Sequence, residues 1–195
     1  MARRQAEKAG RGIMTAPWVS RMPMKSAPGG KSFTLLARTM SAYLSAMIDD
    51  LYSARILTLA ANMPRSGRLT APQGTGQRVA KLCGSTATVD VVLDEAGRVA
   101  DYAQAVKACA LGQAAAGVLG EHVIGATGDE IEQARDALLA MLKSGGQGPE
   151  GRFAELRMLK QVAAYPARHA STLVAVEAAL DAVREAERAR ISGAA

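Results

Sequence analysis

The 195-residue sequence contains 49% hydrophobic residues, enough to build a core, which excludes a globally disordered chain. Its formal net charge of +6 is uneven: residues 1–46 carry eight basic side chains and one acidic one, whereas residues 47–195 carry 16 basic and 17 acidic. We therefore expect residues 1–46 to be a basic, disordered extension with a charge of +7 and residues 47–195 to form one domain with a charge of −1.

Composition also restricts the partners and the location of the protein. Aromatic residues make up only 4% of the chain, too few for a base-stacking surface, and the basic excess lies in the extension, so we expect no nucleic-acid binding by the domain. No apolar run reaches the length of about 18 residues that a membrane helix needs. The extension lacks the apolar segment of a secretory signal. We expect a cytoplasmic protein, or a mitochondrial one if the Arg- and Ser-bearing extension is a transit peptide.

The first half of the domain predicts one helix and a small sheet. A helix from Asp49 would present an apolar face that includes Ile56 and Leu57, followed by a loop over 64–76. Gly74-Thr75-Gly76 is too short for a nucleotide-binding loop, and we interpret it as a chance pattern. Strands are predicted at 77–82, 86–93 and 99–108, with a hairpin turn at 94–97. Together they would form a three-stranded antiparallel sheet.

The second half predicts helices only. An Ala- and Gly-rich helix covers 110–123, and a capping box at 127–130 opens another that ends near Lys143. After a linker at 144–149, a third helix has one apolar face and ends at Pro166, and a last helix covers 167–190. The apolar face of the third helix consists of Phe153, Leu156, Leu159 and Val162. The order of helix, antiparallel strands and helices predicts the α+β class.

The two cysteines occupy positions where a thiol can react or bind metal. Cys83 lies on a turn between two predicted strands, and Cys109 lies where a strand ends and a helix begins. A helix N-terminus favours the thiolate, which is the metal-binding and nucleophilic form. Two cysteines are too few for a disulfide framework, which indicates a reducing compartment. The spacing alone leaves open a structural role as small buried apolar side chains.

Three segments in a fixed order add a family resemblance. They are Lys81-Leu-Cys-Gly-Ser85, Ala108-Cys-Ala-Leu-Gly-Gln113 and Tyr165-Pro-Ala-Arg-His-Ala-Ser171. This arrangement resembles the NifU/IscU/SufU family of iron–sulfur cluster assembly scaffolds over roughly residues 50–185, and its Pro-Ala-Arg segment resembles the SufU branch. The resemblance implies a non-enzymatic scaffold with a three-stranded antiparallel sheet packed against helices. It also implies that sulfur comes from a cysteine desulfurase and that apo iron–sulfur proteins receive the cluster.

The chain departs from the family pattern at two ligand positions. Ser85 stands where the family has the Asp of Cys-Gly-Asp, and Ser171 stands where it has the third Cys. The resemblance therefore implies a cofactor site with Cys83, Cys109 and Ser171. His169 lies two residues before Ser171 and would supply a nitrogen if the helix start turns it inward, so the metal ligands would be Cys83, Cys109 and His169, completed by an exogenous thiol or water. His169 also fits a surface or capping role beside Arg168. Such a site would hold a labile [2Fe–2S] cluster or iron, within a homodimer or with a small-molecule thiol.

Two alternatives remain. The losses at Ser85 and Ser171 fit a degenerate scaffold that binds the assembly machinery without a cluster. Some SufU-like proteins are zinc-dependent sulfur acceptors for a desulfurase, but a tight zinc site needs four ligands and this chain lacks at least two of them. A hydrolase built on Ser171 and His169 would have no orienting acid, so we expect no enzymatic activity.

Overall fold

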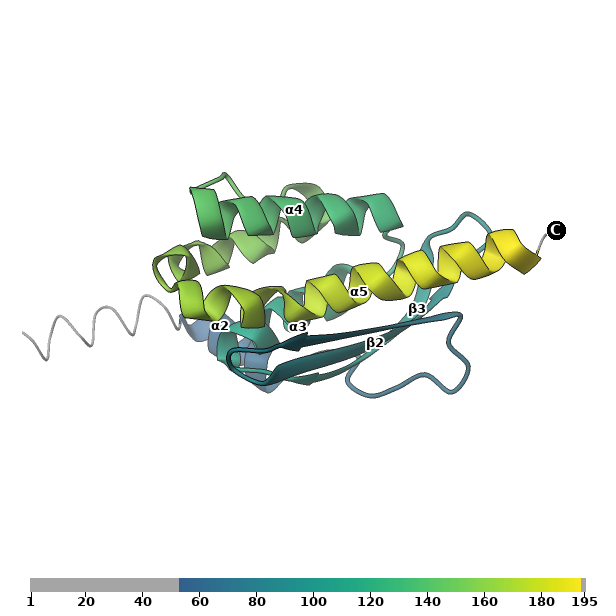
Figure 1. The fold of residues 1–195 in the computed structure, drawn as a ribbon, viewed down its shortest axis with the longest axis horizontal. Coiled ribbons are helices and arrows are strands. Elements are labelled where there is room, and N and C mark those ends of the chain that lie inside the picture. Colours follow the sequence, from purple (N-terminus) through teal and green to yellow (C-terminus); the bar gives the residue numbers. More distant parts are fainter. Residues whose placement is uncertain (1–52, 194–195) are drawn as a thin grey trace, which may run out of the picture. The chain divides into compact units, whose positions relative to one another are not determined.

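The computed structural model describes residues 53–193, and the predicted boundary between residues 46 and 47 lies outside them. One helix, three strands and four further helices follow one another along the chain (Figure 1). This order confirms the predicted α+β class. The elements are α2 (Ala54–Ala61), β1 (Gly74–Ala80), β2 (Ser85–Leu93), β3 (Val99–Lys107), α3 (Ala110–His122), α4 (Gly128–Ser144), η1 (Gly151–Ala164) and α5 (Pro166–Gly193).

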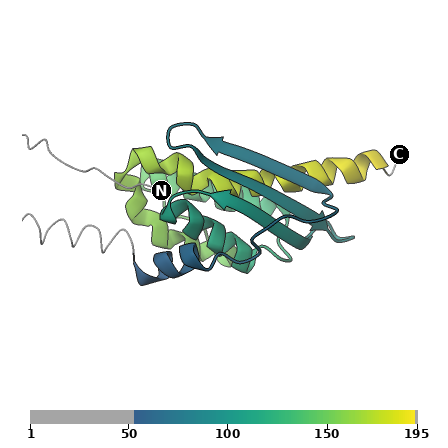
Figure 2. The same ribbon diagram turned by 90° about the horizontal axis from the view of Figure 1, so that it is seen from below.

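The sheet is antiparallel in the order β1-β2-β3, as predicted. On β2 every second residue is fully buried, as the two-residue period of a strand requires: Ala87, Val89 and Val91 have no exposed surface. The helices lie on one side of the sheet, and α5 runs along β1 and β2 (Figures 1 and 2). The hairpin turns therefore lie at the two ends of α5.

Two glycines of β1 let α5 approach the sheet closely. A Cβ atom at Gly76 would overlap the carbonyl oxygen of Ala178, and one at Gly74 would overlap that of Ala182. The interpretation of Gly74-Thr75-Gly76 as a chance pattern is therefore wrong, because helix packing requires its two glycines. β1 begins at Gly74, three residues before the start predicted at residue 77.

The predicted helices are present, with two differences. Thr127 and Glu130 form the expected capping box at α4, with hydrogen bonds of 2.8 and 3.2 Å. In α2, Leu59 is buried beside Ile56, whereas Leu57 is 48% exposed and does not belong to the apolar face. The third helix, η1, is 3₁₀ and has a kink at Phe153, and its predicted apolar residues, spaced by three, are all buried. Within residues 53–193, none of the helices has both the length and the apolarity to span a bilayer.

Candidate functional site

Cys83 lies on the tight turn that joins β1 to β2. The backbone N–H groups of Cys83 and Gly84 both donate to the carbonyl of Ala80, at 3.2 and 2.9 Å. Gly84 has a φ of +69°, a left-handed conformation in which a side chain would be strained. The turn leaves Cys83 exposed and directs its thiol toward Ser85, whose Oγ is 3.1 Å from the Cys83 Sγ.

Cys109 and Ser171 bring the ends of two helices together. Cys109 is the N-cap of α3, and its Sγ lies 3.3 Å from the Oγ of Ser171 on α5. Ser171 is fully buried and donates its hydroxyl proton to the carbonyl of Arg168 at 2.9 Å. A Cβ at Gly112 would overlap the Ser171 carbonyl, so this glycine allows the first turn of α3 to contact α5.

The electrostatics of the turn favour the thiolate of Cys83. Hydrogen bonds from the side chain and the backbone of Ser85 lower the pKa of Cys83 against the opposing effect of burial. Ser171 contacts the other cysteine, Cys109, which comes from a separate segment. A lowered pKa raises the fraction of Cys83 that can bind metal at neutral pH.

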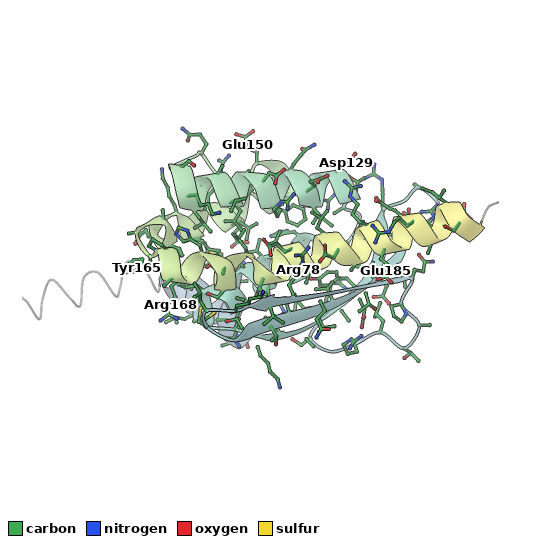
Figure 3. All side chains as sticks on the ribbon, in the orientation of Figure 1. Arg78, Asp129, Glu150, Tyr165, Arg168 and Glu185 are labelled. Carbon is green, nitrogen blue, oxygen red and sulfur yellow. The ribbon has the colours of Figure 1, made fainter. Side chains whose placement is uncertain are left out.

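An open pocket of about 470 Å³ has both cysteines in its wall. Its lining also includes Ser85 and two cationic side chains, Lys107 at the end of β3 and Arg168 near the start of α5. Figure 3 shows Arg168 at the same end of the molecule as the first turns of α5. The sequence-predicted residues Cys83, Cys109 and Ser171 are thus brought together at one end of the sheet.

His169 is not brought to this pocket. Its Nε2 lies 3.1 Å from the carbonyl oxygen of Val162, and its side chain lines a different cavity of about 750 Å³ with residues of β1, α4 and η1. Successive residues of an α-helix are rotated by about 100°, so His169 and Ser171 lie about 200° apart around α5. The predicted placement of His169 among the ligands is therefore corrected: it faces away from the cysteines.

Sequence reasoning missed three polar residues that line the cysteine pocket: Lys107, Gln113 and Arg168. Two of them had a recognisable spacing. Gln113 is four residues after Cys109, and Arg168 is three residues before Ser171, and side chains at these separations lie on one helix face. These two spacings therefore predict Gln113 and Arg168 as neighbours of a site that contains Cys109 and Ser171.

A second group of possible metal donors lies elsewhere, at the end of α3. Donor atoms of Glu121, His122 and Glu155 lie within 4.8 Å of one another. Arg55 forms ion pairs of 2.6 Å with both carboxylates, and His122 lies 3.3 Å from Glu155. Both carboxylates thus already pair with Arg55, and the group ties α2 to α3 and η1.

The comparisons with known proteins agree with this geometry. The chain is 50% identical to the N-terminal part of a nitrogen-fixing NifU-like protein from Brucella abortus; the match has a TM-score of 0.70 and covers 73% of this chain and 98% of that one. A candidate iron–sulfur cluster assembly scaffold for the SUF system from Fervidobacterium islandicum AW-1 has the same fold at 21% identity and a TM-score of 0.63, over 69% and 98% of the two chains.

No curated protein matches the chain. A family model described as NifU-like N terminal domain matches residues 51–172, which is more than half of the sequence. This match confirms the resemblance carried by the three cysteine- and serine-containing segments, and the structural matches confirm the fold that it implied. The chain therefore belongs to the NifU-like N-terminal domain family of scaffolds for iron–sulfur cluster assembly.

Proposed function

We propose that this protein is a scaffold or carrier that holds a [2Fe–2S] cluster or iron as cargo on Cys83 and Cys109. The observation that supports the proposal is that both thiols lie in the wall of one open pocket. Separate parts of the chain supply these groups: the β1–β2 turn, the start of α3 and the start of α5. Exposure of Cys83 gives the cargo a way in and a way out.

The ligand count explains why the cargo would be labile. A [2Fe–2S] cluster is held by four protein ligands in proteins that keep it. This pocket offers two thiols, and the hydroxyl of Ser171 is a neutral group that does not readily bind iron. Two positions would remain for small molecules or for the recipient protein, so exchange would be fast. His169 is left out of the proposed ligand set because it lines another cavity.

The protein's own residues would bind and position the cargo without making or breaking covalent bonds of a substrate. Cys83, which is exposed and has a lowered pKa, and Cys109 would both bind as thiolates and release their protons to solvent. We propose a cysteine desulfurase as the sulfur donor and apo iron–sulfur proteins as recipients. On this proposal the protein is not an enzyme.

Anaerobic reconstitution with iron and sulfide tests the proposal. Wild type should develop charge-transfer absorbance that a chelator removes quickly, and Cys83→Ala should not develop it. Ser171→Cys adds a third thiolate beside Cys109, so this variant should release iron to the chelator about tenfold more slowly. Ser192→Ala, at the far end of α5, is the matched control and should behave like wild type. Wild type without absorbance or bound iron, and no gain from Ser171→Cys, would contradict the proposal.

A second candidate is a degenerate scaffold that binds the assembly machinery without cargo. One observation favours it: among residues 53–193, no group of three His, Cys, Asp or Glu donors includes either cysteine. The same observation weighs against a tight zinc site, which needs four ligands. A double substitution of both cysteines by Ala separates the two functions, because binding of a desulfurase should survive it only in the degenerate scaffold. Metal analysis of protein purified without added metal tests the zinc alternative.

A further inference from the structure

The cysteine pocket has a charge pattern that the two thiols do not account for. Lys107 and Arg168 both line it, both are exposed, and no carboxylate is part of its lining. Within residues 53–193, neither side chain takes part in an ion pair, whereas most other arginines of this region do. Two available cations and a side-chain amide, that of Gln113, therefore face a pocket that contains two metal-binding thiols.

We propose that this pocket binds a low-molecular-weight thiol that carries carboxylates, such as a small peptide thiol. Its sulfur would replace a water on the iron of the cargo, with the thiol proton released to the buffer, and its carboxylates would contact Lys107 and Arg168. The inference rests on the proposed function, because it supplies a ligand that the two cysteines leave missing. It gives a binding role to Lys107, Gln113 and Arg168, which are not proposed as ligands of the cargo.

The placement of the cations fits this ligand. Arg168 lies three residues before Ser171, so its side chain leaves α5 on the face that carries the hydroxyl in contact with Cys109. Lys107 lies two residues before Cys109, at the end of β3. A guanidinium group binds a carboxylate through two parallel hydrogen bonds, and the amide of Gln113 adds a donor. The pocket volume of about 470 Å³ leaves room for a small peptide beside the cargo.

In an alternative role, Lys107 and Arg168 would neutralise a negatively charged cargo and would not contact the thiol. The two roles make different predictions, because neutralisation of the cargo does not depend on which thiol is added. A carboxylate-bearing thiol should bind better than a neutral one only if the cations contact the thiol itself. The comparison of thiols therefore decides between them.

The experiment reconstitutes the full chain anaerobically with iron, sulfide and one of three thiols: glutathione, neutral 2-mercaptoethanol or cationic cysteamine. Charge-transfer absorbance and iron content report the cluster, and mass spectrometry after gel filtration reports the glutathione that stays bound. Glutathione should reach half-maximal loading at a concentration about fivefold lower than 2-mercaptoethanol, and cysteamine should be the weakest. Added salt should reduce the advantage of glutathione.

Variants locate the effect. Lys107→Gln and Arg168→Gln should each bring the ratio of the glutathione and 2-mercaptoethanol concentrations closer to one, whereas Arg188→Gln, on an exposed part of α5 outside the pocket, should keep the wild-type ratio. Equal loading with all three thiols, or an equal loss with every thiol in the two pocket variants, would overturn the inference and leave the proposed function intact. Absence of a cluster with any thiol would overturn both.

Discussion

The hydroxyl of Ser171 has a partner besides the thiol of Cys109. Its only proton is donated to the carbonyl of Arg168, so the contact with Cys109 is made by the S–H group donating to the Ser171 oxygen. Ser171 therefore meets Cys109 as a hydrogen-bond acceptor, and it contributes no negative charge that would hold a metal.

Ser85 sets the reactivity of Cys83, and this is testable in isolation. Its hydrogen bonds are the largest cause of the lowered pKa of Cys83, so Ser85→Ala should raise that pKa toward the ordinary value. In a Cys109→Ala background, the midpoint of the pH profile for alkylation by iodoacetamide should shift to higher pH, because only the thiolate reacts. Mass spectrometry measures the rate at each pH.

The control for this shift is Ser192→Ala in the same background, since Ser192 bonds only within the end of α5. Its alkylation profile should coincide with that of the background protein. If Ser85→Ala leaves the midpoint unchanged, the hydrogen bond between Ser85 and Cys83 does not determine the protonation of the thiol.

At the scale of elements, the contact between β1 and α5 depends on Gly76. A methyl group there would meet the backbone of Ala178, which cannot move away as a side chain can. Gly76→Ala should therefore lower the free energy of unfolding by about 3 kcal/mol, at the upper end of the usual cost of overpacking. Urea denaturation followed by circular dichroism measures the loss.

Gly193→Ala is the matched control, because a Cβ at that position meets no atom within 4 Å. Its urea midpoint should stay at the wild-type value or rise slightly, since alanine favours the helix. A Gly76→Ala variant as stable as wild type would mean that α5 can move away from the sheet at no cost.

The elements that could be predicted were those whose signals are local. The capping box at Thr127 and the turn at Gly97 depend on neighbouring residues, and both were predicted correctly. The role of Gly76 could not be predicted, because it depends on a helix that begins 90 residues later. The spacing of three in η1 did carry the 3₁₀ period, but runs of 3₁₀ helix longer than four residues are uncommon.

The site could be predicted as far as its residues lie on segments that occur in the same order as the segments of the family. Cys83, Cys109 and Ser171 lie on segments that the resemblance aligned, and the structure places them together. His169 was predicted as a neighbour of Ser171 from sequence distance alone, whereas helix rotation turns it to another cavity. Side chains two residues apart on a helix leave it on nearly opposite faces, so closeness in sequence did not place His169 beside the cysteines.

At the scale of the whole molecule, Asp90 joins the sheet to the loop between α2 and β1. The side chain is fully buried on β2 and accepts hydrogen bonds from Arg68 at 2.5 and 2.9 Å, from the N–H of Leu69 at 3.1 Å and from the hydroxyl of Thr75 at 2.8 Å. Burial raises the pKa of Asp90, but these hydrogen bonds outweigh it and hold the pKa below its ordinary value of 3.8.

A carboxyl whose pKa is lower in the folded state stabilises the fold above its unfolded pKa, and that stability is lost as the pH falls through the folded value. Asp90→Asn keeps the shape but removes the charge that Arg68 contacts. At pH 7 the variant should unfold about 2 kcal/mol more easily than wild type, because it loses a charge-assisted hydrogen bond. Below about pH 4 the difference should shrink, since the unfolded wild type then takes up a proton on Asp90 that the folded state resists.

Urea unfolding of both proteins between pH 7 and pH 3 measures this difference, and the comparison cancels the contribution of the other carboxylates, which titrate in both. Asp101→Asn removes the same charge from an exposed position on β3 and should change stability little at any pH. A difference between wild type and Asp90→Asn that stays constant over the whole range would mean that the buried carboxylate acts through its shape and not through its charge. The loop would then be held by hydrogen bonds to two acceptor oxygens, one of which the amide lacks, whatever the charge of the carboxyl.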